Sequence, residues 1–218
     1  MSEQEADTSH YLGKNRIEAL TDGVFAFAMT LLVTSMILPR GADSSALTAA
    51  GALTLLIPDF IHYVIAFFVL AAFWTAHHLQ FSQIRFITRP FLLLNIIGLF
   101  FVTLVPFTTS FVGDYPDALA SIVFELNLMM LGLMMVVQWY YAAGNYRLIS
   151  PKYPELKVQE SLLRALVIPF LSFVGVILAL SGSRDSTLIY LLSPLLSYAV
   201  SRYSAGKQSR KGTNEKTN

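Results

Sequence analysis

A few polar side chains lie inside long apolar stretches, where a helix that served only as a membrane anchor would not need them. Asp22, His77, His78 and Asn95 each fall within such a stretch. Ionisable residues at these depths are rare, because burying them is costly, and they commonly mark functional sites. A carboxylate near imidazoles can form a hydrogen-bonded brace, relay protons or bind a metal ion. Which of these applies depends on whether the four residues meet.

The helical rise per residue places these side chains in one layer. Asp22 lies about 9 Å inside the end of a first helix that starts at Arg16. On the same side of the membrane, the two histidines lie about 10–12 Å inside the end of a second helix, and Asn95 lies about 9 Å inside the start of a third. We therefore expect a polar network, either a conformational brace or a purely structural cluster, formed by Arg16, Asp22, Trp74, His77, His78 and Asn95.

Two other interpretations use the same residues. Asp22, His77 and His78 could relay protons in a secondary transporter. A metal-dependent membrane enzyme would recruit them together with His62 and Glu125. Adjacent helical side chains point about 100° apart, so His77 and His78 cannot easily share one ion. We therefore expect no metal, no other cofactor and no enzymatic activity.

The element that must position Asp22 is the stretch from Arg16 to Pro39. Its apolar and hydroxyl side chains repeat at heptad spacing, so that one narrow stripe runs along the helix. The members within about 100° of arc are Phe27, Thr30, Leu31 and Thr34. Gly23 on the same stripe lets a neighbouring backbone approach. The pattern predicts that several copies of this helix surround a pore, with Asp22 turned toward its own subunit.

The composition restricts the class of protein. With 55% hydrophobic and 13% charged residues among 218, the chain is too apolar for a soluble domain. Cysteine is absent, which excludes disulfides and thiol chemistry. The net charge of +1 implies no nucleic-acid partner. We expect a polytopic protein of the lipid bilayer.

Six apolar runs of bilayer length follow one another, at 16–39, 59–82, 90–112, 117–142, 160–182 and 186–204. We expect an all-α fold with a cytoplasmic segment at 1–15, a six-helix channel domain at 16–204 and a disordered basic tail at 205–218. The segment from Ala46 to Ile57 is either an extension of the second helix or a short interfacial helix. A single helix cannot enclose a water path, so we expect a symmetric homo-oligomer around the first helix.

Basic residues indicate the orientation. Thirteen of them fall on one side of a six-span arrangement, whereas Arg40 and Arg184 fall on the other. The excess of Lys and Arg marks the cytoplasmic side. We therefore expect a multi-pass protein of the cell membrane with both termini in the cytoplasm.

The motifs resemble a known family. Arg16 followed by Leu20-Thr21-Asp22-Gly-Val-Phe-Ala is similar to the first-helix signature of the transmembrane protein 175 potassium channels, in their prokaryotic branch. Phe73-Trp74-Thr-Ala-His77-His78 and Leu104-Val-Pro106-Phe-Thr-Thr-Ser110 resemble that family's second and third helices. Leu20-Thr21 replaces the usual Phe-Ser, Phe27 stands where Ile or Leu is usual, and Thr34 stands where Leu is usual.

The resemblance implies a homotetramer that conducts potassium ions passively through a pore lined by the first helix of each subunit. An apolar constriction would be formed at positions that correspond to Phe27, Thr30, Leu31 and Thr34. From the residues alone, a pore and a transporter both remain possible.

Overall fold

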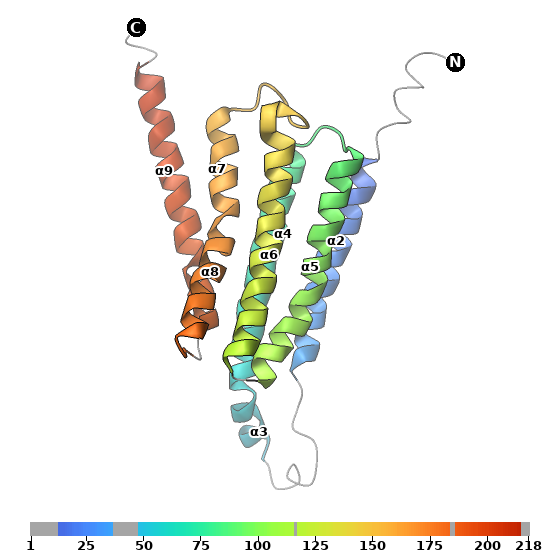
Figure 1. Ribbon diagram of the computed structural model, residues 1–218, viewed down its shortest axis with the longest axis vertical. Helices are drawn as coiled ribbons and strands as arrows, with labels where there is room; N and C mark the ends of the chain where they lie inside the picture. The colour runs from blue at the N-terminus through green and yellow to red at the C-terminus, as the bar shows by residue number, and fades with distance from the viewer. Residues whose placement is uncertain (1–12, 37–47, 116, 184–185, 215–218) are drawn as a thin grey trace, which may run out of the picture.

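The computed structural model describes residues 13–36, 48–115, 117–183 and 186–214, and their regular structure is helical (Figure 1). Isolated β-bridge positions occur at Ile84, which pairs antiparallel with Ile149, and at Ile87, and the described residues form no β-strand. The long helices form one bundle, in which the start of α2 and the end of α9 lie at the same end. The expected all-α fold is confirmed.

Five stretches of the described chain are long and apolar enough to cross a membrane, given the roughly 20 residues that a bilayer requires. They are α2 (Lys14–Leu31) with the 3-10 helix η1 (Leu32–Ser35), α4 (Ile57–Ser82), α5 (Arg89–Asp114), α6 (Ala118–Ala143) with η3 (Gly144–Tyr146), and α7 (Glu155–Ala165) with α8 (Val167–Leu180). The chain is therefore a multi-pass membrane protein.

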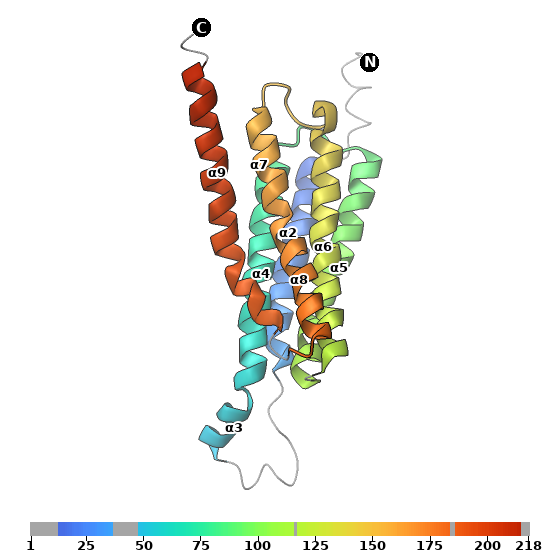
Figure 2. The ribbon, with the colours of Figure 1, turned by 60° about the vertical axis from the view of Figure 1, so that its left-hand side comes forward.

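Local sequence explains where these helices begin. Pro58 and Pro90 stand in the first turns of α4 and α5, where the missing N–H of proline costs no helical hydrogen bond. Asp117 caps α6, because its carboxylate accepts a hydrogen bond of 2.8 Å from the backbone N–H of Ala120. The segment before α4 forms a separate short helix, α3 (Ala49–Leu55), which is angled away from α4 (Figure 2). Ala46 and Leu47 lie outside the described residues.

The fifth span differs from its expected form, since it starts at Glu155 rather than at residue 160 and is broken at Leu166. Pro169 explains the break. In a continuous helix its nitrogen would donate to the carbonyl of Ala165, but proline has no N–H to donate. The result is two helices that continue in nearly the same direction (Figure 1).

The expected sixth span is not among the five apolar stretches. Its residues form the 3-10 helix η4 (Ser186–Leu192) and then α9 (Ser193–Asn214). Pro194, which cannot donate to the carbonyl of Tyr190, stands at this change of helix type. Since α9 continues to Asn214, much of the expected disordered tail at 205–218 is helical, and residues 215–218 lie outside the described residues.

Helix α6 forms the centre of the bundle, between α5 on one side and α8 on the other. Its buried side chains include Phe124, Leu128 and Leu131. A second apolar cluster at the end of the bundle where α2 begins surrounds Trp139, whose indole N–H donates to the carbonyl of Val158 at 3.1 Å. These two clusters hold α2, α4 and α5 in fixed positions.

The close approach of α6 to α8 depends on Gly132. A Cβ atom at this position would lie 2.5 Å from Cγ and 2.6 Å from Cδ of Pro169. The proline ring cannot rotate away, so we expect Gly132→Ala to destabilise the fold by about 1–3 kcal/mol. Thermal denaturation of the purified protein in detergent measures this loss. Gly206→Ala is the matched control, because a Cβ atom there has no neighbour within 4 Å, and an equal loss in both variants would contradict the steric explanation.

Candidate pore-lining helix and its polar network

The stripe predicted on the first helix is the face of α2 that its own subunit leaves uncovered. Phe27 is 64% exposed, Leu20 is 51% exposed, and Thr30 and Thr34 are also exposed, whereas Leu31 is partly buried. The opposite face is buried against α4 and α5 through Ile17, Thr21, Phe25, Ala28 and Leu32. A membrane helix thus presents large apolar side chains and hydroxyls on one uncovered face.

The two threonines of this face direct their hydroxyl protons inward. Thr30 Oγ1 donates to the carbonyl oxygen of Phe27 at 2.8 Å, and Thr34 Oγ1 donates to that of Leu31 at 2.6 Å. Because each proton is engaged by the helix's own backbone, the oxygen lone pairs remain available as acceptors. A cation passing along this face would therefore meet hydroxyl oxygens between apolar side chains.

Behind this face lies a chain of buried hydrogen bonds that joins three helices. Asn95 of α5 donates from Nδ2 to Thr21 Oγ1 of α2 at 3.0 Å. The Oδ1 atom of Asn95 lies 3.0 Å from Nε2 of His77 on α4. Since Oδ1 can only accept, His77 is the donor in this pair. Thr21 is fully buried, Asn95 is 1% exposed and His77 is 8% exposed, so this chain fixes α2 against α4 and α5.

A second contact joins α2 and α4 closer to the surface. The indole N–H of Trp74 donates to Oδ1 of Asp22 at 2.9 Å. Trp74 in turn stacks on His78, with ring centroids 5.8 Å apart. Asp22 thus binds its own subunit, as its position on the helix predicted, while Trp74 and His78 remain exposed.

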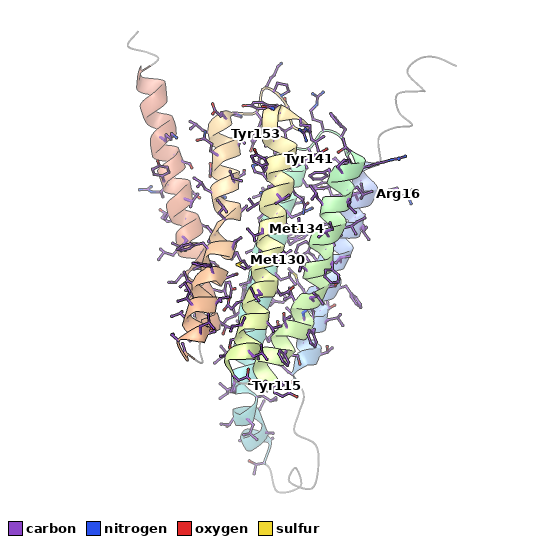
Figure 3. The ribbon with its side chains drawn as sticks, in the orientation of Figure 1. Arg16, Tyr115, Met130, Met134, Tyr141 and Tyr153 are labelled. Carbon is purple, nitrogen blue, oxygen red and sulfur yellow. The ribbon has the colours of Figure 1, made fainter. Side chains whose placement is uncertain are left out.

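The expected polar network is therefore divided into two groups. Asp22, Trp74 and His78 form one, and Thr21, Asn95 and His77 form the other. Arg16 joins neither, because its exposed side chain points away from the bundle (Figure 3) and makes no side-chain hydrogen bond with the described residues. Sequence reasoning missed Thr21, although a threonine next to Asp22 inside an apolar helix is a signal that could have indicated it.

A further buried cluster lies between α6, α8 and η4. The Tyr190 hydroxyl donates to Oε2 of Glu125, and it lies 2.8 Å from Oγ of Ser172. Glu125 and Ser172 are fully buried. The residues considered for a metal site, which are Asp22, His62, His77, His78 and Glu125, are not brought together, since the described part of the chain holds no group of three or more His, Asp or Glu that could bind an ion.

Comparison with known proteins identifies the family. Residues 16–106, which include α2 from Arg16 onward, α4 and the polar network, match the family model described as "Endosomal/lysosomal potassium channel TMEM175". A potassium channel of Streptomyces collinus is 30% identical over 143 residues, which cover 63% of this chain and 68% of that protein. A potassium channel of Chamaesiphon minutus is 31% identical over 141 residues, covering 63% and 70%.

The fold agrees with these matches. The crystal structure of a lysosomal potassium-selective channel TMEM175 homolog from Chamaesiphon minutus has a TM-score of 0.73 to this chain and 24% sequence identity. The match covers 86% of this chain and 97% of the chain in that crystal structure. Since the Streptomyces and Chamaesiphon relatives are 30% and 31% identical over more than two thirds of their own length, and the family model and the fold agree with them, the chain belongs to the TMEM175 family of ion channels.

Proposed function

We propose that this chain is a potassium channel in which α2 of each of four subunits lines the conduction pathway. The observation that carries the proposal is the uncovered stripe of α2, where Phe27, Thr30 and Thr34 are exposed in the isolated subunit. One helix cannot enclose water, so this stripe needs symmetry-related copies around an axis. The names of the Streptomyces and Chamaesiphon relatives support potassium as the conducted ion.

In the proposed pore, Phe27 and Leu31 form an apolar constriction, and Thr30 and Thr34 supply hydroxyl oxygens between the rings. Stripping an ion of water costs tens of kcal/mol in an idealised apolar medium, so an ion must keep most of its hydration shell or find replacement oxygens. Four threonine hydroxyls replace only a few waters. The pore therefore favours potassium, which loses water more easily than sodium, and closes when the apolar rings approach and expel water.

The proposed orientation places both termini in the cytoplasm of a cell-membrane protein, with η4 and α9 as a sixth crossing. Two features support it. The start of α2 and the end of α9 lie at the same end of the bundle (Figure 1), and the basic residues Arg85, Arg89, Arg147 and Lys152 stand in or beside the loops at that end. Tyr141 and Tyr153 lie there as well (Figure 3), as expected for interfacial anchors.

A single experiment tests the function. The purified protein is reconstituted into a planar bilayer with potassium chloride on one side and sodium chloride on the other. Discrete currents that exceed about 10³ ions per second, a common upper turnover number for enzymes, are expected of a channel. A reversal potential displaced toward the potassium equilibrium potential is expected of potassium preference. Slow, saturable flux without unitary steps would contradict conduction through a pore.

The position of α2 at the axis predicts a pattern of disulfide cross-links. The chain contains no cysteine, so single cysteines at Phe27, Thr34 and Phe25 can be compared without background. Cysteines at the exposed positions 27 and 34 are expected to cross-link between subunits under mild oxidation, whereas Phe25 is 2% exposed within its own subunit and is not. Dimer bands on non-reducing gels measure the result. Similar cross-linking at all three positions would remove α2 from the axis.

A further inference from the structure

An apolar groove opens on the side of the bundle remote from α2. It has a volume of about 520 Å³ and lies between α4 and α9, with α7, α8 and η4 forming its floor. In the described part of the chain, no Cα atoms of α4 and α9 lie within 8 Å of one another, and α9 stands to one side of the bundle beside α7 (Figure 2). The walls carry Phe68 and Leu191, which are 67% and 65% exposed. The volume falls within the usual range of about 300–1,000 Å³ for ligand sites.

The shape of the groove suits a chain-like apolar ligand. Its lining on α4 extends from Val64 to Gln80, which corresponds to about 24 Å at about 1.5 Å per residue. The hydrocarbon region of a bilayer is about 30 Å thick, so one lipid layer occupies about half of that. The groove is therefore long enough for an acyl chain that lies parallel to α4.

The polar end of the groove is positively charged. Arg164 of α7 lines it and donates to Ser201 of α9, and its guanidinium lies 3.0 Å from Oε1 of Glu160. Glu160 is also engaged by Lys157, at 2.8 Å, so two cations share one carboxylate. The described side chains of α7 and α9 carry more positive than negative charge. The cationic ones are Lys157, Arg164, Arg202 and Lys207, and the anionic ones are Glu155 and Glu160.

From this combination we propose that the groove binds an anionic phospholipid, with one acyl chain between α4 and α9 and the headgroup phosphate at Arg164. A guanidinium presents several N–H donors in a fixed plane, and a phosphate can accept two of them at once. Arg164 is 40% exposed in its side chain and stands at the end of an apolar wall, which is where a headgroup would lie above its chain. A neighbouring copy of α9 in the groove would bring like charges together at this end.

The test uses the full-length protein, purified in detergent and stripped of co-purified lipid. Phosphatidylglycerol and phosphatidylcholine of identical acyl chains are titrated separately, and the melting temperature and the bound lipid in native mass spectra are recorded. Phosphatidylglycerol is expected to raise the melting temperature, to remain bound, and to lose binding at high salt. Equal binding of both lipids, or no binding of phosphatidylglycerol, overturns the proposal without any variant.

Substitutions at two positions of the groove, Arg164 and Ala72, locate the lipid. Arg164→Gln is expected to weaken phosphatidylglycerol binding about tenfold or more, whereas Arg164→Lys is expected to retain most of the binding. Arg85 is an exposed basic residue outside the groove, so Arg85→Gln is expected to leave the binding unchanged.

Ala72→Trp places a large ring in the groove at an exposed position and is expected to abolish binding. Ala118→Trp, which lies outside the groove, is expected to leave binding intact. Unchanged binding in Ala72→Trp overturns the site, and so does a loss of subunit assembly with lipid binding retained, because the groove would then hold a second copy.

Discussion

Asn95→Leu is expected to destabilise the subunit by about 2–6 kcal/mol, more than any other single change in the polar network. The leucine side chain has a similar size, so little packing is lost. The substitution removes at once the partner of Thr21 and that of His77, which bond to Asn95 at 3.0 Å each. Each buried polar group left without a partner costs about 1–3 kcal/mol. Denaturation of the detergent-solubilised protein, followed by circular dichroism, measures the change.

The exposed hydrogen bond between Asp22 and Trp74 shows how much of the expected loss depends on burial. Asp22→Ala also removes a hydrogen-bond partner, but Trp74 is 38% exposed and can meet water or lipid headgroups instead. We therefore expect Asp22→Ala to destabilise the protein less than Asn95→Leu does. His78→Ala serves as the control, because His78 makes a ring contact with Trp74 at the surface. If His78→Ala and Asn95→Leu have equal effects, the buried chain does not stabilise the fold.

The depth of the polar residues could be predicted, but their pairing could not. Rise per residue is nearly constant in a helix, so Asp22, His77 and Asn95 fall in one layer once the ends of their helices are recognised. Pairing depends on how each helix is rotated about its axis. Adjacent residues point about 100° apart, and this rotation sends Thr21 to Asn95 while Asp22 meets Trp74. It likewise separates His77 from His78.

The same rotation bears on the proton-relay interpretation. His77 donates to Asn95 within the bundle and His78 lies on the surface. In the described part of the chain no hydrogen bond links Asp22 to either histidine. The bonds of Asp22 to Trp74 and of His77 to Asn95 join α2 to α4 and α4 to α5.

Apolar runs located most of the helices but not their breaks. The apolar run predicted one span at 160–182, whereas the structure begins it at Glu155 and the missing N–H of Pro169 divides it at Leu166. The cluster of Glu125 with Tyr190 was missed for a different reason. Tyr190 belongs to η4, 65 residues further along the chain, and no local pattern shows which helix a 3-10 segment will pack against.

Phe27→Ala is expected to have the largest effect on conduction. In the proposed tetramer, removal of four phenyl rings would widen the constriction and lower the cost of keeping water around the ion. If the barrier falls by about 1.4 kcal/mol, the ion flux rises about tenfold. Unitary currents in planar bilayers measure the change. Val33→Ala is the control, because Val33 is also exposed on α2 but lies about 120° around the helix from Phe27. Unchanged current in Phe27→Ala would place the gate elsewhere.

Thr30→Ala separates selectivity from conductance at the next turn of the same stripe. In the proposed tetramer the substitution would remove a ring of four oxygen acceptors and leave the apolar rings in place, so potassium preference is expected to fall while unitary current and assembly change little. Reversal potentials between potassium and sodium solutions measure this change in preference.

Thr103→Ala on α5 is the matched control, since Thr103 is exposed and its hydroxyl donates to the carbonyl of Phe100 at 2.7 Å, as Thr30 does to Phe27 at 2.8 Å. Both threonines therefore direct their lone pairs away from the helix backbone, and they differ in whether an ion would pass them. An equal change in the two variants would assign the effect to helix structure, whereas a change in Thr30→Ala alone would assign it to contact between hydroxyl oxygens and the permeating ion.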